Sequence, residues 1–427
     1  MELELNVMHH LIIGAGAAGV AAAETLRQHS ADDRITLISS EHSEPYSRMA
    51  IPYLLTNKIE ERGTHLRQRS DYYRTQRIDI LHDNVTGIDA GSRQVTLSSG
   101  STIDYDRCLI ASGSLPVRPA IEGIDLPLVQ SCWTLEDARE VARLTKQGTP
   151  VVLMGAGFIG SIILEALALR GVELTVVEHQ DRMVPRMMGE KAGGLLKSWC
   201  ESKGVKVLTS TDILSVKSIS IDRVAVELSS GETLEAGLVI AAAGVKPNLD
   251  FVRSGQIDIQ HGILVDRYMR TSAPDLYAAG DVAQALDRST GKPMVQAIQP
   301  TAVEHGRLAA LNMIKPESVA HRGSLIMNVL DTLGLLSCSI GIWQGVAGGD
   351  SVERYDPKRF RYQCLQFSGD RLIGATIVGH RDHQGALRGL IEGEYSLGRF
   401  KELLLKDPNR IMEAYLAVSQ SDATLVR

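Results

Sequence analysis

The fold of this chain is decided by two glycine-rich stretches, Gly14-Ala15-Gly16-Ala17-Ala18-Gly19 and Gly155-Ala156-Gly157-Phe158-Ile159-Gly160. Each follows a short apolar run, Leu11-Ile12-Ile13 in the first case and Val151-Val152-Leu153-Met154 in the second. In a strand–turn–helix unit, the first glycine permits the tight turn, the second lets the backbone approach a pyrophosphate, and the third allows the helix to pack closely on the strand. The sequence therefore predicts two dinucleotide sites, each at the N-terminus of a helix.

Around these turns, the spacing of apolar residues predicts two complete βαβ units. The first has a strand at His9–Ile13, an alanine-rich helix at Ala17–His29 and a strand at Arg34–Ser39. Its strands are short and rich in β-branched residues, as buried parallel strands are. The corresponding segments of the second unit are Val151–Met154, Phe158–Arg170 and Glu173–Val177.

Each unit is followed by short strands around a Ser-Ser-Gly turn, and we interpret each group as an inserted β-meander. From about Ser324 the pattern changes to alternating strands followed by helices, without a glycine fingerprint. The expected meander strands are Val95–Leu97, Ser101–Ile103 and Arg107–Ile110, then Val224–Leu228, Thr233–Leu234 and Leu238–Ala242. The later elements are a helix at Ala302–Met313, strands at Leu325–Val329, Ser337–Ile340, Phe360–Phe367 and Leu372–Val378, and helices at Gln384–Ile391 and from Phe400 to Ser419 with an interruption at Pro408.

Composition narrows the class of protein. The 427 residues allow two or three domains, and the formal charge of −6 comes without a basic block. Nucleic acid and anionic membranes are therefore not expected as partners. The apolar runs are too short to span a bilayer, and the segment from Met1 to His10 lacks the features of a signal peptide. We expect a cytoplasmic protein.

The cysteines give no sign of redox or metal chemistry. Five are present and no two lie within four residues of each other. This spacing argues against a disulfide framework, a zinc site, a CxxC pair and an iron–sulfur cluster within the chain. We expect no metal site and mostly buried thiols.

The residue after the second strand of each unit is a candidate ribose ligand. In the second unit it is Glu178, whose carboxylate can accept hydrogen bonds from both ribose hydroxyls and would repel a 2′-phosphate. No arginine follows until Arg182, so the sequence favours NAD(H) over NADP(H). In the first unit the candidate is Glu41, one place late, and the alternative is an exposed loop acid.

A third motif runs from Thr271 to Asp281 and ends in Tyr277-Ala278-Ala279-Gly280-Asp281. It resembles the signature of the pyridine nucleotide–disulfide oxidoreductase superfamily, in which the aspartate accepts a bond from a flavin ribityl hydroxyl. Further segments resemble the family at the expected places along nearly the whole chain. They are Pro45-Tyr46-Ser47-Arg48, Cys108-Leu109-Ile110-Ala111-Ser112-Gly113-Ser114-Leu115-Pro116, Ala241-Ala242-Ala243-Gly244-Val245-Lys246-Pro247-Asn248 and Gln299-Pro300-Thr301-Ala302.

The resemblance implies two interleaved Rossmann-like domains, as in glutathione reductase, plus a C-terminal α/β domain. The FAD domain would comprise residues 1–115 and 245–322, the NAD domain 116–244, and a dimerisation or partner-docking domain 323–427. The residues implied to bind FAD are Gly14, Gly16, Ala17, Ala18, Gly19, Glu41, Arg48, Ala111, Ser112, Gly113, Gly280, Asp281, Pro300 and Thr301. Those implied to bind NAD(H) are Gly155, Gly157, Phe158, Ile159, Glu178 and Gly244.

The chain departs from the family at positions that carry chemistry. Met49 stands where coenzyme A reductases and peroxidases have a redox cysteine, and Tyr53 stands where ferredoxin and rubredoxin reductases often have lysine. Those reductases often have glutamate at the place of Ile162, and Glu165 follows one helical turn later. Glu165 and His305 are the candidate catalytic side chains, but we favour a solvated or ion-paired helix carboxylate and a structural histidine instead. The flavin itself is the expected redox group.

The segment from Glu44 to Leu55 and the ending from Gly374 to Ile391 resemble one branch of the superfamily. It includes NADH nitrite reductases, rubredoxin reductases and the flavin subunits of multi-subunit enzymes such as phenylglyoxylate dehydrogenase and tungsten-dependent aldehyde oxidoreductase. The preferred interpretation is a flavin subunit that passes electrons between NAD(H) and a ferredoxin-like iron–sulfur subunit. The alternatives are a free-standing NADH:rubredoxin or ferredoxin reductase, which would be homodimeric, and an NAD(H)-binding flavoprotein acting as a redox sensor, like apoptosis-inducing factor.

Overall fold

The computed structural model describes residues 7–380 and 382–425, and the chain forms two compact units. The first comprises Met1–Leu115 and Val245–Ser324, and the second comprises Pro116–Gly244 and Leu325–Arg427. The start of the N-terminal segment, residues 1–6, and Arg381 in the C-terminal motif lie outside the described residues.

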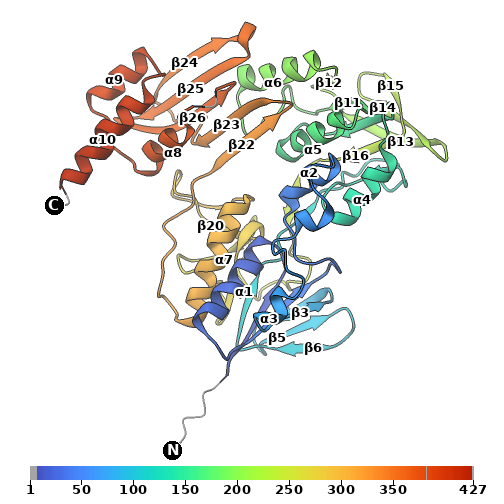
Figure 1. Ribbon diagram of the computed structural model, residues 1–427, viewed down its shortest axis with the longest axis vertical. Coiled ribbons are helices and arrows are strands. Elements are labelled where there is room, and N and C mark those ends of the chain that lie inside the picture. Colours follow the sequence, from blue (N-terminus) through green and yellow to red (C-terminus); the bar gives the residue numbers. More distant parts are fainter. Residues whose placement is uncertain (1–6, 381, 426–427) are drawn as a thin grey trace, which may run out of the picture. The chain divides into compact units, whose positions relative to one another are not determined.

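A five-stranded parallel sheet is the centre of the first unit (Figure 1). Its strand order is β19-β7-β1-β2-β3, so the strand order reverses beside β1. Leu11 and Ile12 of β1 are fully buried, as expected for a strand with both faces covered. The five strands are β1 (His9–Ile13), β2 (Arg34–Ser39), β3 (Ile78–His82), β7 (Arg107–Ile110) and β19 (Leu276–Ala278).

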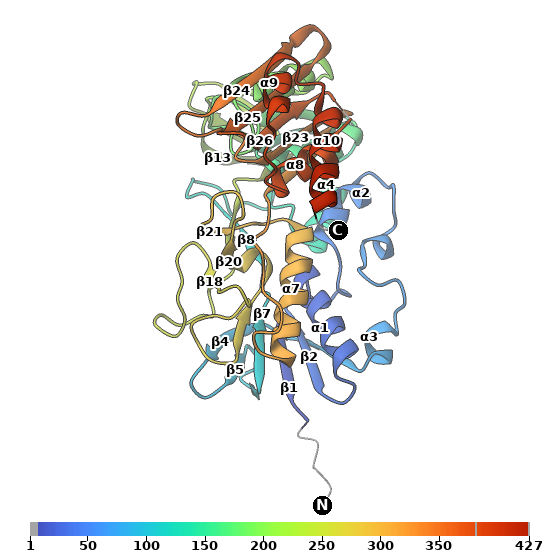
Figure 2. The same cartoon turned by 90° about the vertical axis from the view of Figure 1, so that its left-hand side faces the viewer.

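Two helices, α1 (Ala17–His29) and α7 (Gln299–Ile314), lie side by side on this sheet (Figure 2). Their close approach depends on Gly306, because a Cβ there would lie 2.2 Å from the carbonyl oxygen of Ala18. The remaining strands are β4 (Val85–Asp89), β5 (Gln94–Leu97), β6 (Thr102–Asp104), β8 (Ser114–Pro116), β17 (Val245–Pro247), β18 (Ile263–Leu264), β20 (Ala283–Leu286) and β21 (Pro293–Val295). The short helices are η1 (Arg48–Ala50), α2 (Ile51–Leu55), η2 (Glu61–Thr64), α3 (Tyr72–Thr75) and η3 (Gly280–Val282).

The second unit repeats the parallel arrangement with the order β12-β11-β10-β16-β9. An antiparallel meander of β13, β14 and β15 accompanies it. The strands are β9 (Val129–Gln130), β10 (Pro150–Met154), β11 (Glu173–Val177), β12 (Lys206–Leu208), β13 (Ile213–Ser220), β14 (Arg223–Leu228), β15 (Thr233–Ala236) and β16 (Leu238–Ala241). The helices are α4 (Leu135–Leu144), α5 (Phe158–Leu169) and α6 (Glu190–Ser202).

The second unit also contains an antiparallel sheet of order β22-β23-β26-β25-β24. Helices α8 and α10 cover its apolar core, which includes Leu365, Phe367 and Leu387. The elements are β22 (Met327–Thr332), β23 (Leu335–Gly341), β24 (Asp350–Asp356), η4 (Pro357–Arg359), β25 (Arg361–Ser368), β26 (Arg371–Val378), α8 (Gln384–Glu392), α9 (Arg399–Lys406) and α10 (Ile411–Leu425). No helix of the described part of the chain is long and apolar enough to cross a membrane.

The predicted meanders were partly wrong. Arg107–Ile110 and the strand at Leu238 pair with β1 and β10 in the parallel sheets, and the first meander strands, β4 and β13, were not predicted. β24 was also not predicted, because it is a largely exposed edge strand that carries no apolar alternation. Both parallel strands follow their meanders directly, so the sequence alone gave no boundary between the two kinds of strand.

Candidate nucleotide-binding sites

The first glycine turn has two crowded positions and one open position. Gly14 has φ +112°, and a Cβ there would lie 2.2 Å from the carbonyl oxygen of Ala111 on the adjacent chain segment. A Cβ on Gly19 would lie 1.9 Å from the carbonyl oxygen of Gly14. By contrast, nothing lies within 4 Å of a Cβ on Gly16, the N-cap residue of α1, and no side chain caps this helix end. This open, uncapped helix N-terminus fits a pyrophosphate.

The second turn is built in the same way. Gly155 has φ +98°, and a Cβ there would lie 2.5 Å from the carbonyl oxygen of Ala242. A Cβ on Gly160 would lie 2.1 Å from the carbonyl oxygen of Gly155. Gly157 begins α5 with open space and no side-chain cap, followed by the half-buried Phe158 and Ile159. Because crowded and open glycines recur in the same order, the two turns are structural repeats, and the second also fits a dinucleotide.

Glu178 lies directly after β11 and contacts the second turn. Its side chain is 7% exposed. One carboxylate oxygen accepts a hydrogen bond from the amide of Ala156 at 2.6 Å, and the other accepts one from the amide of Gln180 at 2.8 Å. The nearby Arg182 donates to the carbonyl of Met188 and to Asp181, so its guanidinium already has partners. The structure thus brings Glu178 to the glycine turn, where the sequence predicts a ribose contact.

Glu41 is fixed by two donors of the following loop. The Tyr46 hydroxyl donates to one carboxylate oxygen at 2.6 Å, and the Arg48 guanidinium donates to the other at 2.9 Å. Glu41 is therefore not the freely exposed loop acid of the alternative interpretation. Tyr46, in the segment Pro45-Tyr46-Ser47-Arg48, is thus a further contact of this site that sequence reasoning missed.

Asp281 lies in η3 with a buried carboxyl group. Burial raises its pKa, while the hydrogen bond from the Ser114 hydroxyl, at 2.8 Å, and the charge of Arg48 oppose that rise. Gly280 has φ +75° and packs between Ala18 and Ala302. Ser114 is thus a further contact of the site that sequence reasoning missed. It belongs to the quoted segment that ends at Pro116.

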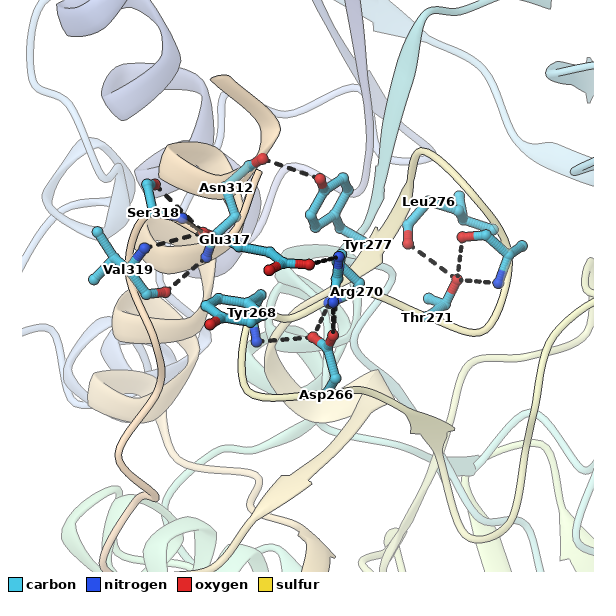
Figure 3. Close-up of polar contacts among 11 residues, drawn as sticks. Asp266, Tyr268, Arg270, Thr271, Leu276, Tyr277, Asn312, Glu317, Ser318 and Val319 are labelled. Atoms are coloured by element: carbon cyan, nitrogen blue, oxygen red, sulfur yellow. Dashed lines mark hydrogen bonds and ion pairs between the residues drawn. The ribbon is translucent and has the colours of Figure 1, made fainter. Parts of the chain in front are cut away.

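A polar network holds the segment before Asp281 against α7 (Figure 3). The Tyr277 hydroxyl donates to the carbonyl of Asn312 at 3.0 Å. Arg270 bonds both Asp266 and Glu317, at 2.8 Å and 2.7 Å. These contacts fix β19 relative to the helix whose first residues are also expected in the flavin site.

The other predicted FAD residues surround the same turn. The carbonyl of Ala111 lies close to Gly14. The Ser112 hydroxyl donates to the carbonyl of Asn248 at 2.9 Å, and the backbone amide of Asn248 donates to the carbonyl of Gly113 at 2.9 Å. At the start of α7, Pro300 is exposed and Thr301 is buried. Gly244, predicted for NAD(H), has φ +106° and open space around it, as Gly113 does.

His305 lies in a buried cluster rather than at an open surface. Its ring packs edge-on against His321 with 4.9 Å between centroids, and both rings contact the Ser324 hydroxyl. Burial, and to a smaller extent His321, lowers the pKa of His305 to about 3. The ring is therefore neutral at physiological pH, which favours the structural interpretation over a proton donor.

Glu165 contacts the antiparallel sheet of its own unit. Its carboxylate accepts a hydrogen bond from the backbone amide of Leu333, at 3.2 Å, in the turn between β22 and β23. From α6, the Trp199 indole N–H donates to the carbonyls of Thr332 and Leu333 at 3.0 and 3.2 Å. The two side chains bind the same turn, which favours a structural interpretation of Glu165.

The thiols are buried and the position of the absent redox cysteine is exposed. All five cysteines are free and buried. Burial raises the pKa of the Cys132, Cys200 and Cys338 thiols to about 12. Met49 is 46% exposed. Among residues 7–380 and 382–425, no group of His, Cys, Asp and Glu side chains could hold a metal ion.

Together these features define an oxidoreductase-type α/β protein with two Rossmann-like dinucleotide turns. The chain belongs to the pyridine nucleotide-disulphide oxidoreductase family, whose pattern matches residues 8–306. The membership confirms the suspected superfamily, the fold class and the expectation of an oxidoreductase. Members of the family contain FAD and depend on NAD(H), so the two expected cofactors are confirmed as well.

Relatives resemble the chain along most of its length. It is 28% identical to the NADH-dependent phenylglyoxylate dehydrogenase subunit epsilon of Aromatoleum evansii, over 96% of this chain and 97% of that protein. It is 30% identical to an NADH oxidase of Methanocaldococcus jannaschii, over 87% of this chain and 88% of that protein. Identity to a rubredoxin-NAD(+) reductase of Pseudomonas putida is 28%, with 90% and 98% covered.

Solved structures agree with the fold. A NAD-dependent persulfide reductase from A. fulgidus superposes with a TM-score of 0.83 at 26% identity, over 92% of this chain and 78% of that chain. Putidaredoxin reductase, in its covalent complex with putidaredoxin, superposes with a TM-score of 0.87 over 97% and 100% of the chains. Its 23% identity supports the fold alone.

Proposed function

We propose that this protein is the FAD-containing, NAD(H)-binding subunit of a larger oxidoreductase. It would pass electrons between NAD(H) and an iron–sulfur partner protein. When bound, the flavin takes a hydride from NADH and exchanges electrons with the partner. The chain's own residues bind the two nucleotides, orient them and exclude water.

The first turn would hold FAD. Gly16 would leave room for the pyrophosphate at the start of α1. Asp281 would accept a hydrogen bond from a ribityl hydroxyl, with Ser114 orienting its carboxyl group. Glu41, held by Tyr46 and Arg48, would receive the adenosine ribose. The second turn would hold NAD(H), with Gly157 beside the pyrophosphate and Glu178 beside the ribose.

The domain roles form part of the proposal. Residues 1–115 and 245–322 would form the FAD domain, and residues 116–244 the NAD domain. Residues 323–427 would serve for dimerisation or for docking a partner. We place the protein in the cytoplasm.

The assignment as a subunit is carried by the similarity to phenylglyoxylate dehydrogenase subunit epsilon, because it spans nearly the full length of both chains. The state of the thiols supports an acceptor outside this chain. Met49 occupies the position of a redox cysteine. The five cysteines are buried, and burial raises the pKa of each thiol. A thiol is therefore a poor candidate for the second redox group.

A free-standing rubredoxin or ferredoxin reductase is the second candidate. It is supported by the 28% identity to a rubredoxin-NAD(+) reductase over 90% of this chain. Tyr53 and Ile162 weaken this candidate, because they replace the lysine and glutamate often found in that group.

Affinity capture of the tagged chain from its native host, under anoxic conditions, separates the two candidates. The subunit assignment predicts a stable complex that contains a protein with iron–sulfur clusters in fixed ratio to FAD. Recovery of a homodimer alone, active with added rubredoxin, would rule out the subunit assignment and leave the free-standing reductase.

A further inference from the structure

The loop that contains Arg48 carries an exposed surface. The loop closes on itself, because Tyr46 and His65 form an antiparallel bridge and Ser47 bonds the carbonyl of Thr64. Ile51 and Leu55, one helical turn apart on α2, are buried. Met49, in the preceding η1, and Tyr53, on α2, are 46% and 53% exposed.

Basic side chains accompany this apolar pair. The Lys58 ammonium lies over the Tyr53 ring, 5.9 Å from its centroid. The Arg62 guanidinium donates to the neutral carbonyl of Gln68, so this contact leaves its charge uncompensated. We call Met49, Tyr53, Lys58 and Arg62 the α2 surface.

The charge around the α2 surface is opposite to that of the whole chain. Residues 48–77 contain seven Lys or Arg against three Asp or Glu, a net charge of +4 in a chain of −6. Four of the arginines, Arg48, Arg67, Arg69 and Arg77, are paired with carboxylates, whereas within residues 7–380 and 382–425 the structure shows no ion pair for the exposed Lys58, Arg62 and Arg74. The segment lies along the outside of α1, to which Arg67 and Tyr72 bind through Glu24 (Figure 2).

The loop is attached directly to the proposed FAD residues. At its start, Arg48 bonds Glu41, and the Ser47 hydroxyl donates to the side chain of Gln299 at 2.7 Å. Gln299 is the first residue of α7, next to Pro300 and Thr301. A protein bound to the α2 surface would therefore contact the same loop that holds the flavin site.

We infer that the α2 surface docks an acidic iron–sulfur electron-carrier protein. This inference rests on the proposed function and names where the partner binds. Met, Tyr and Arg are the residue types enriched at the centres of protein interfaces. The local positive charge would attract an acidic carrier and speed its association, an effect that salt weakens. Met49 and Tyr53 would supply the apolar contact at the position where relatives carry redox or basic side chains.

The test uses the intact flavoprotein, a purified acidic rubredoxin as the probe and NADH as the reductant. The double variant Lys58→Glu with Arg62→Glu reverses the charge of the α2 surface. The matched control, Lys292→Glu with Lys315→Glu, makes the same change in net charge at two exposed lysines elsewhere in the first unit. A third variant, Tyr53→Ala, removes the aromatic contact without changing charge. Ferricyanide reduction and flavin content report whether each variant is folded and loaded.

We expect the charge-reversed variant to lose about tenfold or more in kcat/KM for rubredoxin, with a weaker dependence on salt. Tyr53→Ala should lose kcat/KM at all salt concentrations, and the control should change less than about twofold. Ferricyanide rates should stay unchanged in all three. Wild-type kinetics in both α2 variants would overturn the docking assignment alone. A wild-type enzyme that reduces ferricyanide but not rubredoxin would overturn the assignment together with the proposed partner class.

Discussion

The carboxylate of Glu178 accepts a hydrogen bond from the backbone amide of Ala156, with 2.6 Å between the two atoms. Ala156 is the second residue of the glycine turn, and Glu178 follows the next strand of the same sheet. This bond places a buried negative charge beside the turn that would receive the nicotinamide dinucleotide. We expect this charge to determine the selectivity between NADH and NADPH.

The protein should prefer NADH over NADPH by about tenfold or more, because a 2′-phosphate would lie against the Glu178 carboxylate and their repulsion costs about 1 kcal/mol or more even when screened. Glu178→Ala should narrow that ratio. Glu173→Ala, at the exposed start of the same strand, is the control. The kcat/KM values for both cofactors with ferricyanide measure the effect. Equal wild-type values for NADH and NADPH would show that Glu178 does not contact the ribose.

Asp281→Ala should weaken FAD binding. A ribityl hydroxyl would lose its acceptor and the Ser114 hydroxyl would lose its partner, at a cost of roughly 1–3 kcal/mol. Dialysis followed by absorbance spectroscopy measures the flavin retained, with the exposed Asp258→Ala as the control. The prediction fails if Asp281→Ala retains flavin as well as Asp258→Ala does.

His305 should make the fold sensitive to acid. Its pKa in the folded protein, about 3, lies below the ordinary value of 6.5, so the neutral ring stabilises the fold above pH 6.5. That contribution is lost as the pH falls from 6.5 towards 3, on the order of a few kcal/mol. His305→Gln should flatten the dependence of the unfolding free energy on pH over this range. If the variant does not fold, NMR titration of the His305 ring in the wild-type protein measures its pKa directly. Protonation of this ring near pH 6.5 would contradict the prediction.

Glu165 should be dispensable for electron transfer. Glu165→Ala removes the acceptor of the Leu333 amide and should lower the unfolding free energy by roughly 1–2 kcal/mol. Glu165→Gln keeps an acceptor oxygen and should lose less. Both variants should keep the NADH:ferricyanide kcat within about twofold, because hydride transfer to flavin needs no protein acid. A folded Glu165→Gln protein with a strongly reduced kcat would assign this side chain a part in the chemistry.

Local signals in the sequence predicted the elements that carry the glycine turns. The bounds of β1, α1, β2 and β11 agree with the predicted ones, because each has a continuous apolar pattern, and a nearby glycine marks one end of β1, α1 and β11. The sheet to which each strand belongs was harder to predict from the sequence. The strand at Arg107 looks like its meander neighbours in sequence, and only the long-range pairing with β1 separates it from them.

The candidate site was predicted residue by residue but not contact by contact. The pairs Glu41–Tyr46 and Ser114–Asp281 join segments 5 and 167 residues apart, and no spacing rule connects them. The neutral state of His305 likewise depends on burial beside His321, which only the packing of the folded chain determines.

The central claim is that electrons from NADH leave this chain for a separate iron–sulfur protein. It is tested most directly by adding NADH under anoxic conditions to the complex captured from the native host, while low-temperature EPR records the clusters. The account predicts that NADH reduces clusters of the co-purified protein, and that removing FAD abolishes this reduction. Flavin reduction without any cluster signal, in a preparation that contains only this chain, would contradict the claim.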